Sequence, residues 1–165
     1  RIRPLGPPYD EAMTLTAALN VHGTAIVIGT TGLLFVGPSG TGKSAVALHC
    51  IGEARARGLF AALVSDDQVL VSEAGGRLIA RAPASIAGLA ELRGAGIVGV
   101  ETIEAAVLRR AIRPVEPPFS ERPPPEGETV EILPFRPLPL TLLPLFAGCT
   151  AFSTLAAIHP EILRI

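Results

Sequence analysis

The feature that most constrains the fold is the segment GPSGTGKS at residues 37–44. It matches the pattern G-x-x-x-x-G-K-[ST] at every fixed position, through Gly37, Gly42, Lys43 and Ser44. Glycines allow consecutive backbone N–H groups to point into one concavity, which suits phosphate oxygens. The pattern has this meaning only between a buried strand and a helix. The chain is therefore expected to contain a strand–loop–helix unit.

Both neighbours of the loop fit that requirement. The apolar run LLFV predicts a strand over 33–37, and apolar residues at helical spacing predict a helix over 43–57 that Gly58 ends. We therefore expect the loop to bind the phosphates of a nucleoside triphosphate. Lys43 would reach the β and γ phosphates, and the Ser44 hydroxyl would bind Mg²⁺. The expected binding residues are Gly37, Pro38, Ser39, Gly40, Thr41, Gly42, Lys43 and Ser44.

Composition makes a chance match improbable. Lys43 is the only lysine of the chain, and two of its three aspartates, Asp66 and Asp67, are adjacent. Apolar residues make up 48% of the 165 residues and charged residues 18%, which favours one folded domain over disorder. A pI near 6.3 argues against a nucleic-acid-binding protein. We expect a flexible arm over 1–12 and a single folded domain over 13–165.

The remaining pattern predicts a mixed sheet with antiparallel hairpins around the strand–loop–helix unit. Expected strands span 14–22, 24–28, 60–65, 107–115 and 129–135, with a hairpin over 68–82 turning at 74–76 and a short helix over 83–94. The uncharged stretch 137–158 is interrupted by prolines, so it predicts a strand ending near Phe146 and a short helix, not a membrane span. Cys50 and Cys149 fit buried thiols of a cytoplasmic protein and form no zinc pattern.

Four polar positions outside the loop are candidate site residues. Asp66 and Asp67 follow a buried strand, where one carboxylate can support Mg²⁺ and the other can serve as a general base. A solvated turn is the alternative. Glu91 and Arg93 lie among glycines, which favours a second metal ligand and a group that stabilises phosphoryl charge, although a surface pair at a helix end remains open.

Four motifs occur in an order that resembles a known family. They are HG at 22–23, GPSGTGKS at 37–44, DD at 66–67 and ELRGAGI at 91–97. This order resembles the catalytic domain of HPr kinase/phosphorylase, over about residues 14–158. Members of that family phosphorylate a serine of the small phosphocarrier HPr, and their catalytic domain is similar to the nucleotide site of phosphoenolpyruvate carboxykinase. The chain resembles a short form without the family's usual N-terminal domain.

The resemblance implies a role for each matching residue. Residues 37–44 would bind ATP, with Ser44 and Glu91 as Mg²⁺ ligands. Asp67, or else Asp66, would accept the proton of the serine hydroxyl. The implied catalytic set is His22, Lys43, Asp66, Asp67, Arg93 and Arg122. An HPr-like phosphocarrier would be the partner, without nucleic acid or membrane insertion, and the chain would form a homo-oligomer, by resemblance a hexamer.

Three departures from the family pattern limit what the resemblance implies. Pro38 stands where Asp is frequent and Ala45 where Glu is frequent. The PVKxGRN-like loop linked to dephosphorylation is replaced by LPLFAGCTAF, which lacks Lys and Arg, so kinase activity is better supported than phosphorolysis of phosphoseryl-HPr. Two other functions stay open: a P-loop kinase of small molecules and a non-catalytic ATP-binding regulatory domain.

Overall fold

The computed structural model describes residues 18–120 and 126–164. Its elements are β1 (Leu19–His22), β2 (Thr24–Ile28), β3 (Thr31–Phe35), α1 (Lys43–Ala56), β4 (Ala61–Ser65), β5 (Gln68–Ala74), β6 (Arg77–Arg81), β7 (Leu89–Leu92), β8 (Gly96–Gly99), β9 (Ala105–Val115), β10 (Thr129–Val130), β11 (Leu138–Pro144), α2 (Ala151–Ile158) and the 3₁₀ helix η1 (Pro160–Leu163). The expected mixed α/β architecture is confirmed.

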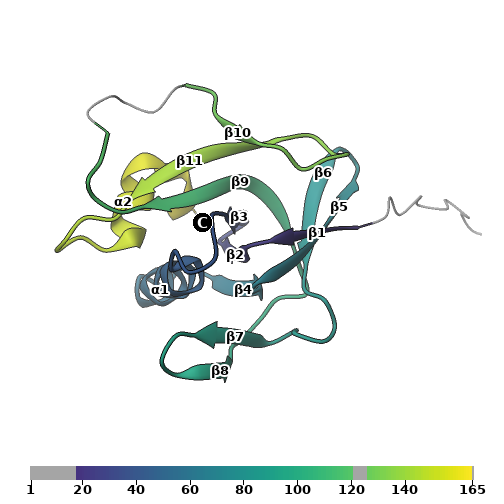
Figure 1. The fold of residues 1–165 in the computed structure, drawn as a ribbon, viewed down its shortest axis with the longest axis horizontal. Coiled ribbons are helices and arrows are strands. Elements are labelled where there is room, and N and C mark those ends of the chain that lie inside the picture. Colours follow the sequence, from purple (N-terminus) through teal and green to yellow (C-terminus); the bar gives the residue numbers. More distant parts are fainter. Residues whose placement is uncertain (1–17, 121–125, 165) are drawn as a thin grey trace, which may run out of the picture.

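One curled, mixed sheet of nine strands forms the centre of the molecule (Figure 1). Seven strands follow the order β1-β5-β6-β9-β3-β2-β4, and β11 and β10 extend it from β9. The long strand β9 pairs antiparallel with β6 and parallel with β3 and β11. Helices α1 and α2 lie together on one side of the sheet, and the β7–β8 hairpin stands apart from it (Figure 1).

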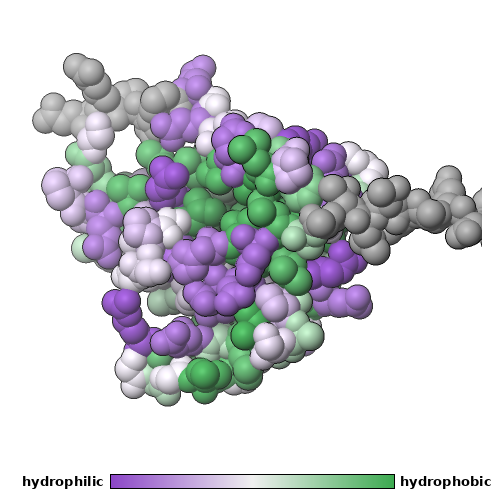
Figure 2. All heavy atoms as spheres, turned by 45° about the vertical axis from the view of Figure 1, so that its right-hand side comes forward, coloured by the Kyte–Doolittle hydropathy of each residue, from purple (hydrophilic) through white to green (hydrophobic). Residues whose placement is uncertain are grey.

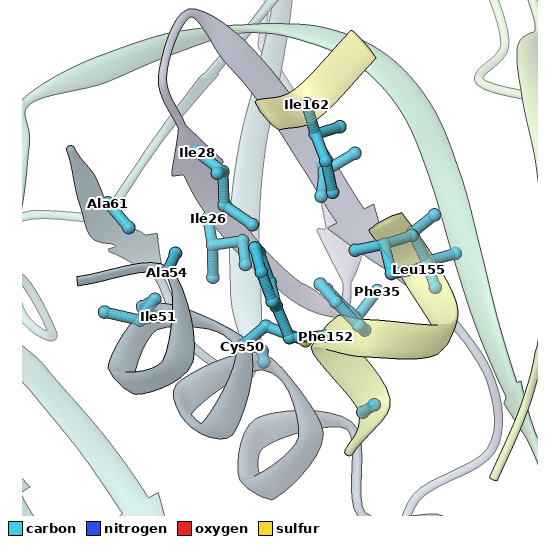
Figure 3. Close-up of a cluster of buried hydrophobic side chains, with 14 of the residues drawn as sticks. Ile26, Ile28, Phe35, Cys50, Ile51, Ala54, Ala61, Phe152, Leu155 and Ile162 are labelled. Carbon is cyan, nitrogen blue, oxygen red and sulfur yellow. The ribbon is translucent and has the colours of Figure 1, made fainter. Parts of the chain in front are cut away.

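The sheet separates two hydrophobic clusters. All five residues of β2 are buried, and the four apolar ones, at 25–28, alternate between the two clusters. Ile26 and Ile28 face the helices, where Phe35 and Phe152 also pack (Figure 3). Ala25 and Val27 face the inside of the curl. A strand covered on both faces is apolar at every position, which explains the run AIVI.

Helix α1 confirms the expected helix, and its two ends are set by glycines. Gly42 precedes Lys43 in a left-handed conformation (φ 76°), and Gly58 follows the helix with the same φ. At the C-terminal end, the Gly58 N–H donates to Arg55 O, which closes the last turn. The strand expected over 33–37 begins and ends two residues earlier, so the loop opens at Val36.

Most other expected elements are also confirmed. The strand at 24–28 matches β2, and β5 and β6 form the hairpin with Gly75 and Gly76 at its turn, both at positive φ. Of the strand expected over 14–22, residues 19–22 form β1, and 14–17 lie outside the described residues, as does the arm expected over 1–12. The strand and the short helix expected within 137–158 are β11 and α2. Within the described ranges, no helix is long and apolar enough to cross a membrane.

Three expectations were wrong. Instead of a helix over 83–94, two turns lead into β7, because Gly88 is in a left-handed conformation (φ 78°) and residues 89–92 pair with β8. The strand expected over 129–135 stops at Val130, and a turn at 132–135 follows, closed by a hydrogen bond from the Phe135 N–H to Ile132 O. Cys50 is buried, which raises the pKa of its thiol to about 12, but Cys149 is exposed.

The surface is not uniformly polar. Figure 2 shows hydrophobic residues in the upper middle of one face, bordered by hydrophilic ones. Among the described residues, Ile97 on β8 is 72% exposed and Leu133 is 69% exposed. Scattered exposed apolar residues are normal for a folded domain, so these positions need no special explanation.

Candidate active site

The loop between β3 and α1 holds the ammonium group of Lys43 in a fixed position. Lys43 is 7% exposed, and its Nζ donates to Gly37 O (3.0 Å) and to Pro38 O (2.8 Å). Nζ also lies 3.3 Å from His22 Nε2. A buried ammonium group needs such acceptors because it has three donors and no lone pair. The loop therefore places a positive charge at the N-terminus of α1, where the helix dipole has the same sign.

His22 joins the loop to the aspartate pair. Since Lys43 Nζ can only donate, His22 Nε2 accepts and the ring proton lies on Nδ1. Nδ1 lies 3.0 Å from Asp67 O and 3.2 Å from Asp67 Oδ1, so it donates towards the turn between β4 and β5. The Ser39 hydroxyl is 3.3 Å from Nε2. His22 is thus oriented from both sides by residues of the site.

Asp66 is the buried member of the pair, at 4% exposed. Its Oδ1 accepts hydrogen bonds from Ser44 Oγ (2.7 Å) and Thr24 Oγ1 (2.8 Å), and its Oδ2 accepts from the Glu91 N–H (3.0 Å). Three donors compensate the carboxylate for the loss of water. Asp66 therefore links β2, the start of α1 and β7 in one network.

Asp67 has a different environment. Its side chain is 63% exposed, and its backbone is left-handed (φ 65°), the one positive φ outside glycine among the described residues. Aspartate tolerates this conformation better than most residues. The Gly23 N–H donates to Asp67 O, which fixes the turn against β1. The turn thus holds one aspartate inside the protein and presents the other to solvent.

The β7–β8 hairpin brings Glu91 and Arg93 to the loop. The two strands pair antiparallel from Leu89↔Gly99 to Leu92↔Gly96. The Arg93 guanidinium lies over Gly40, where an added Cβ would approach Nη2 to 2.8 Å. Glycine is favoured at position 40 by its positive φ of 85°, and a Cβ there would also push the flexible Arg93 side chain aside.

These elements surround a cavity of about 220 Å³. Its lining includes most of the predicted site residues: His22, Ser39, Gly40, Gly42, Lys43, Ser44, Asp66, Asp67, Glu91 and Arg93. Gly37, Pro38 and Thr41 belong to the loop but do not line the cavity, and Arg122 lies outside the described residues. The structure thus brings four separate motifs of the sequence to one place.

One residue of this network was not predicted. Thr24 is 1% exposed, lines the cavity and donates to Asp66 Oδ1. The available signal was a hydroxyl at the start of the otherwise apolar strand TAIVI, directly after the HG motif. A buried hydroxyl needs a hydrogen-bond partner, but the sequence alone does not identify Asp66 as that partner.

The oxygen donors at this cavity suit a magnesium ion. Ser44, Asp66 and Glu91 all line it, and hydroxyl and carboxylate oxygens are ligands that Mg²⁺ accepts. Within the described part of the chain, no cluster of three His, Cys, Asp or Glu side chains could hold a metal alone.

The protein thus has a mixed α/β fold with a curled sheet, and the cavity lies at the N-terminus of α1. The same fold occurs in the structure of the Hpr(Ser) kinase/phosphatase from Coxiella burnetii, with a TM-score of 0.70 and 25% identity, over 88% of this chain and 92% of that chain. A family model described as HPr Serine kinase C-terminal domain matches residues 13–110, more than half of the sequence. The chain belongs to this family.

Curated relatives agree with the family model. An HPr kinase/phosphorylase from Mycoplasmopsis pulmonis is 36% identical over 85 residues, and one from Brevibacillus brevis is 34% identical over 103 residues. These matches cover 52% and 62% of this chain, but 26% and 31% of the two relatives. The chain therefore matches about a quarter to a third of the length of these relatives.

Proposed function

We propose that the chain is an ATP-dependent protein kinase that phosphorylates a serine of an HPr-like phosphocarrier. One observation carries the proposal: Lys43, Ser44, the aspartate pair and Glu91 line one cavity at the N-terminus of α1. Phosphoryl transfer depends mainly on positioning and on stabilisation of charge, so such a constellation suits it. The names of the relatives supply the acceptor, HPr.

The loop side of the cavity would bind the triphosphate. Gly37 O, Pro38 O and His22 Nε2 hold the Lys43 ammonium group beside the triphosphate, and one of these three hydrogen bonds would pass to a phosphate oxygen. The N–H groups at the start of α1 and the helix dipole add to this attraction. Ser44, with Asp66 and Glu91 nearby, would hold Mg²⁺, which supplies further neutralisation of the phosphate oxygens when bound.

The two aspartates would divide the remaining work. Asp66 is buried and accepts three hydrogen bonds, which suits a fixed carboxylate near the metal. Asp67 is exposed beside His22 and is accessible to an incoming serine. In the proposed step the serine oxygen bonds to the γ phosphorus and the bond from that phosphorus to the bridging oxygen breaks. The hydroxyl proton passes to Asp67, and ADP leaves.

Rates of transfer to purified HPr test the assignment. Lys43→Met is expected to lower the rate about a hundredfold or more, because it removes a charge aimed at the phosphates. Asp67→Asn is expected to lower the maximal rate and leave ATP binding intact. Glu73→Gln on β5, outside the cavity lining, serves as the matched control. Equal rates for Asp67→Asn and Glu73→Gln would contradict the role of Asp67 as the base.

A further inference from the structure

A second cavity of about 340 Å³ lies at the other end of β3. The first cavity adjoins the loop after Phe35, whereas the second begins at Thr30 and Thr31, where β3 starts. The other polar groups in its lining are Arg109 and Arg110 of β9 together with His159 and Glu161. None of these residues belongs to the candidate active site.

A bulge in β9 turns both arginines towards this cavity. Gly32 pairs with Leu108 and Leu33 pairs with Arg110, so Arg109 has no partner on β3. Leu108 and Ala111 pack in the cluster inside the curl, although they are three residues apart. Arg109 and Arg110 therefore both point to the helix side of the sheet, instead of alternating between faces as neighbours in a regular strand do.

Gly32 permits this arrangement. A Cβ at residue 32 would overlap the backbone oxygen of Val107, so only glycine lets β3 approach β9 so closely beside the bulge. Bulges of this kind re-aim side chains and are frequent beside functional sites. The glycine and the bulge together make the arginine pair a built feature of the sheet.

The two guanidinium groups keep donors free for a ligand. Arg109 is exposed, and within the described ranges neither arginine forms an ion pair with a carboxylate. Arg110 is half-buried and donates from Nη1 to Thr141 Oγ1 at 3.3 Å. Since arginine carries five N–H donors, most of those facing the cavity remain available.

The one carboxylate in the lining is engaged elsewhere. Glu161 Oε1 can only accept, so His159 Nδ1, at 3.1 Å, carries the ring proton and donates to it. In the neutral ring Nε2 then accepts from the Thr141 hydroxyl at 2.8 Å, while Thr141 Oγ1 accepts from Arg110. Burial, and next the charge of Arg110, lower the pKa of His159. This chain of hydrogen bonds fixes the wall of the cavity and keeps Glu161 paired with His159.

We propose that the second cavity binds a small molecule through a phosphate group. Two arginines and two threonine hydroxyls offer more donors than the two oxygens of one carboxylate can use, whereas a phosphate presents three terminal oxygens. Arg109, Arg110, Thr30 and Thr31 would contact those oxygens. Glu161 at the edge would accept from a hydroxyl or amino group on the rest of the molecule.

Titration of the ¹⁵N-labelled chain with inorganic phosphate, at constant ionic strength, tests this proposal. Saturable shifts are expected at the amides of Thr31, Arg110 and His159, separate from any shifts at the loop around Gly40. Arg109→Gln should weaken the phosphate affinity that the first set of shifts reports about tenfold or more, since it removes a charge-assisted contact. Arg113→Gln, an exposed arginine of the same strand outside the cavity, should leave it unchanged.

Two results would overturn the proposal. One is the absence of saturable shifts at these three amides in the unsubstituted chain. The other is an equal loss of phosphate affinity in Arg109→Gln and Arg113→Gln, which would show a general effect of net charge. The spectrum of each variant without phosphate reports whether it is folded.

Discussion

The two cavities at the ends of β3 both present cations, but they differ in the carboxylates that accompany them. At the loop, Lys43 shares its cavity with Arg93 and with three carboxylates, those of Asp66, Asp67 and Glu91. At the other end, Arg109 and Arg110 face the single carboxylate of Glu161. A site rich in carboxylates repels a polyphosphate unless a metal ion offsets their charge, whereas an arginine pair attracts an anion directly. The first cavity therefore suits a metal–nucleotide complex and the second a metal-free phosphate.

Removal of divalent metal should separate the two cavities most strongly. With EDTA in excess, we expect transfer to HPr to be lost and ATP binding to weaken, because the carboxylates near Ser44 are then uncompensated. Phosphate shifts at Arg110 should persist under the same conditions. Parallel assays with EDTA and with added Mg²⁺ measure both. Unchanged transfer in EDTA would contradict the metal dependence assigned to the loop cavity.

Thr24→Val should destabilise the network around Asp66. The change keeps the side-chain shape but removes the 2.8 Å hydrogen bond to a carboxylate that is 4% exposed. Loss of one such bond lowers the free energy of unfolding by about 1–3 kcal/mol. Urea denaturation measures this value, with Thr24→Ser as the matched variant that keeps the hydroxyl. If the valine and serine variants are equally stable, the hydroxyl does not support Asp66.

Two glycine substitutions compare the loop with the helix that follows it. Gly40→Ala should lower the free energy of unfolding by about 1–2 kcal/mol, because residue 40 is left-handed, and the new Cβ displaces Arg93. Gly52→Ala in α1 has open space and helical backbone, so it should raise the value by about 0.5–1 kcal/mol. Thermal and urea unfolding measure both. A stabilising Gly40→Ala would show that the loop conformation differs from the one described.

A smaller effect concerns the wall of the second cavity. Burial, followed by the charge of Arg110, lowers the pKa of His159 below its ordinary value of 6.5. The unfolded chain then binds more protons than the folded chain between the two pKa values, so stability is full above 6.5 and falls as the pH drops below it. The pKa of Glu161 is also lowered, from its ordinary value of 4.5, so protonation of Glu161 affects stability only at a lower pH than that of His159.

His159→Gln should therefore flatten the dependence of stability on pH between about 7 and 5. Unfolding by urea at several pH values measures the slope, and His49→Gln, at an exposed position of α1, is the control. The same slope for His159→Gln as for the unsubstituted chain would mean that burial of His159 has no effect on folding.

The parts of the fold that were predictable depend on local sequence. The loop, helix α1 and the β5–β6 hairpin follow from short patterns and from glycines at their ends. The residues of β7 were predicted to end a short helix over 83–94, and only their pairing with residues 96–99 decides otherwise. Local pattern cannot report a partner strand, although Gly94 and Gly96 were consistent with a turn.

The candidate site likewise has parts that local sequence predicts and parts that depend on contacts between distant segments. That Asp66 and Asp67 are adjacent was evident, but which one is buried depends on Thr24 and the N–H of Glu91, which come from distant segments. The second cavity left no motif in the sequence. Its arginines share a face only because β9 bulges against Gly32, and that bulge is a property of strand pairing.

The proposed activity of this chain is transfer of a phosphoryl group from ATP to a serine of an HPr-like protein. Mass spectrometry of purified HPr, incubated with the chain and Mg²⁺ with or without ATP, tests it most directly. We expect the mass of one added phosphoryl group, located on a serine, only when ATP and intact Lys43 are both present. Tight binding of ATP with unmodified HPr, or modification that persists in Lys43→Met, would contradict it.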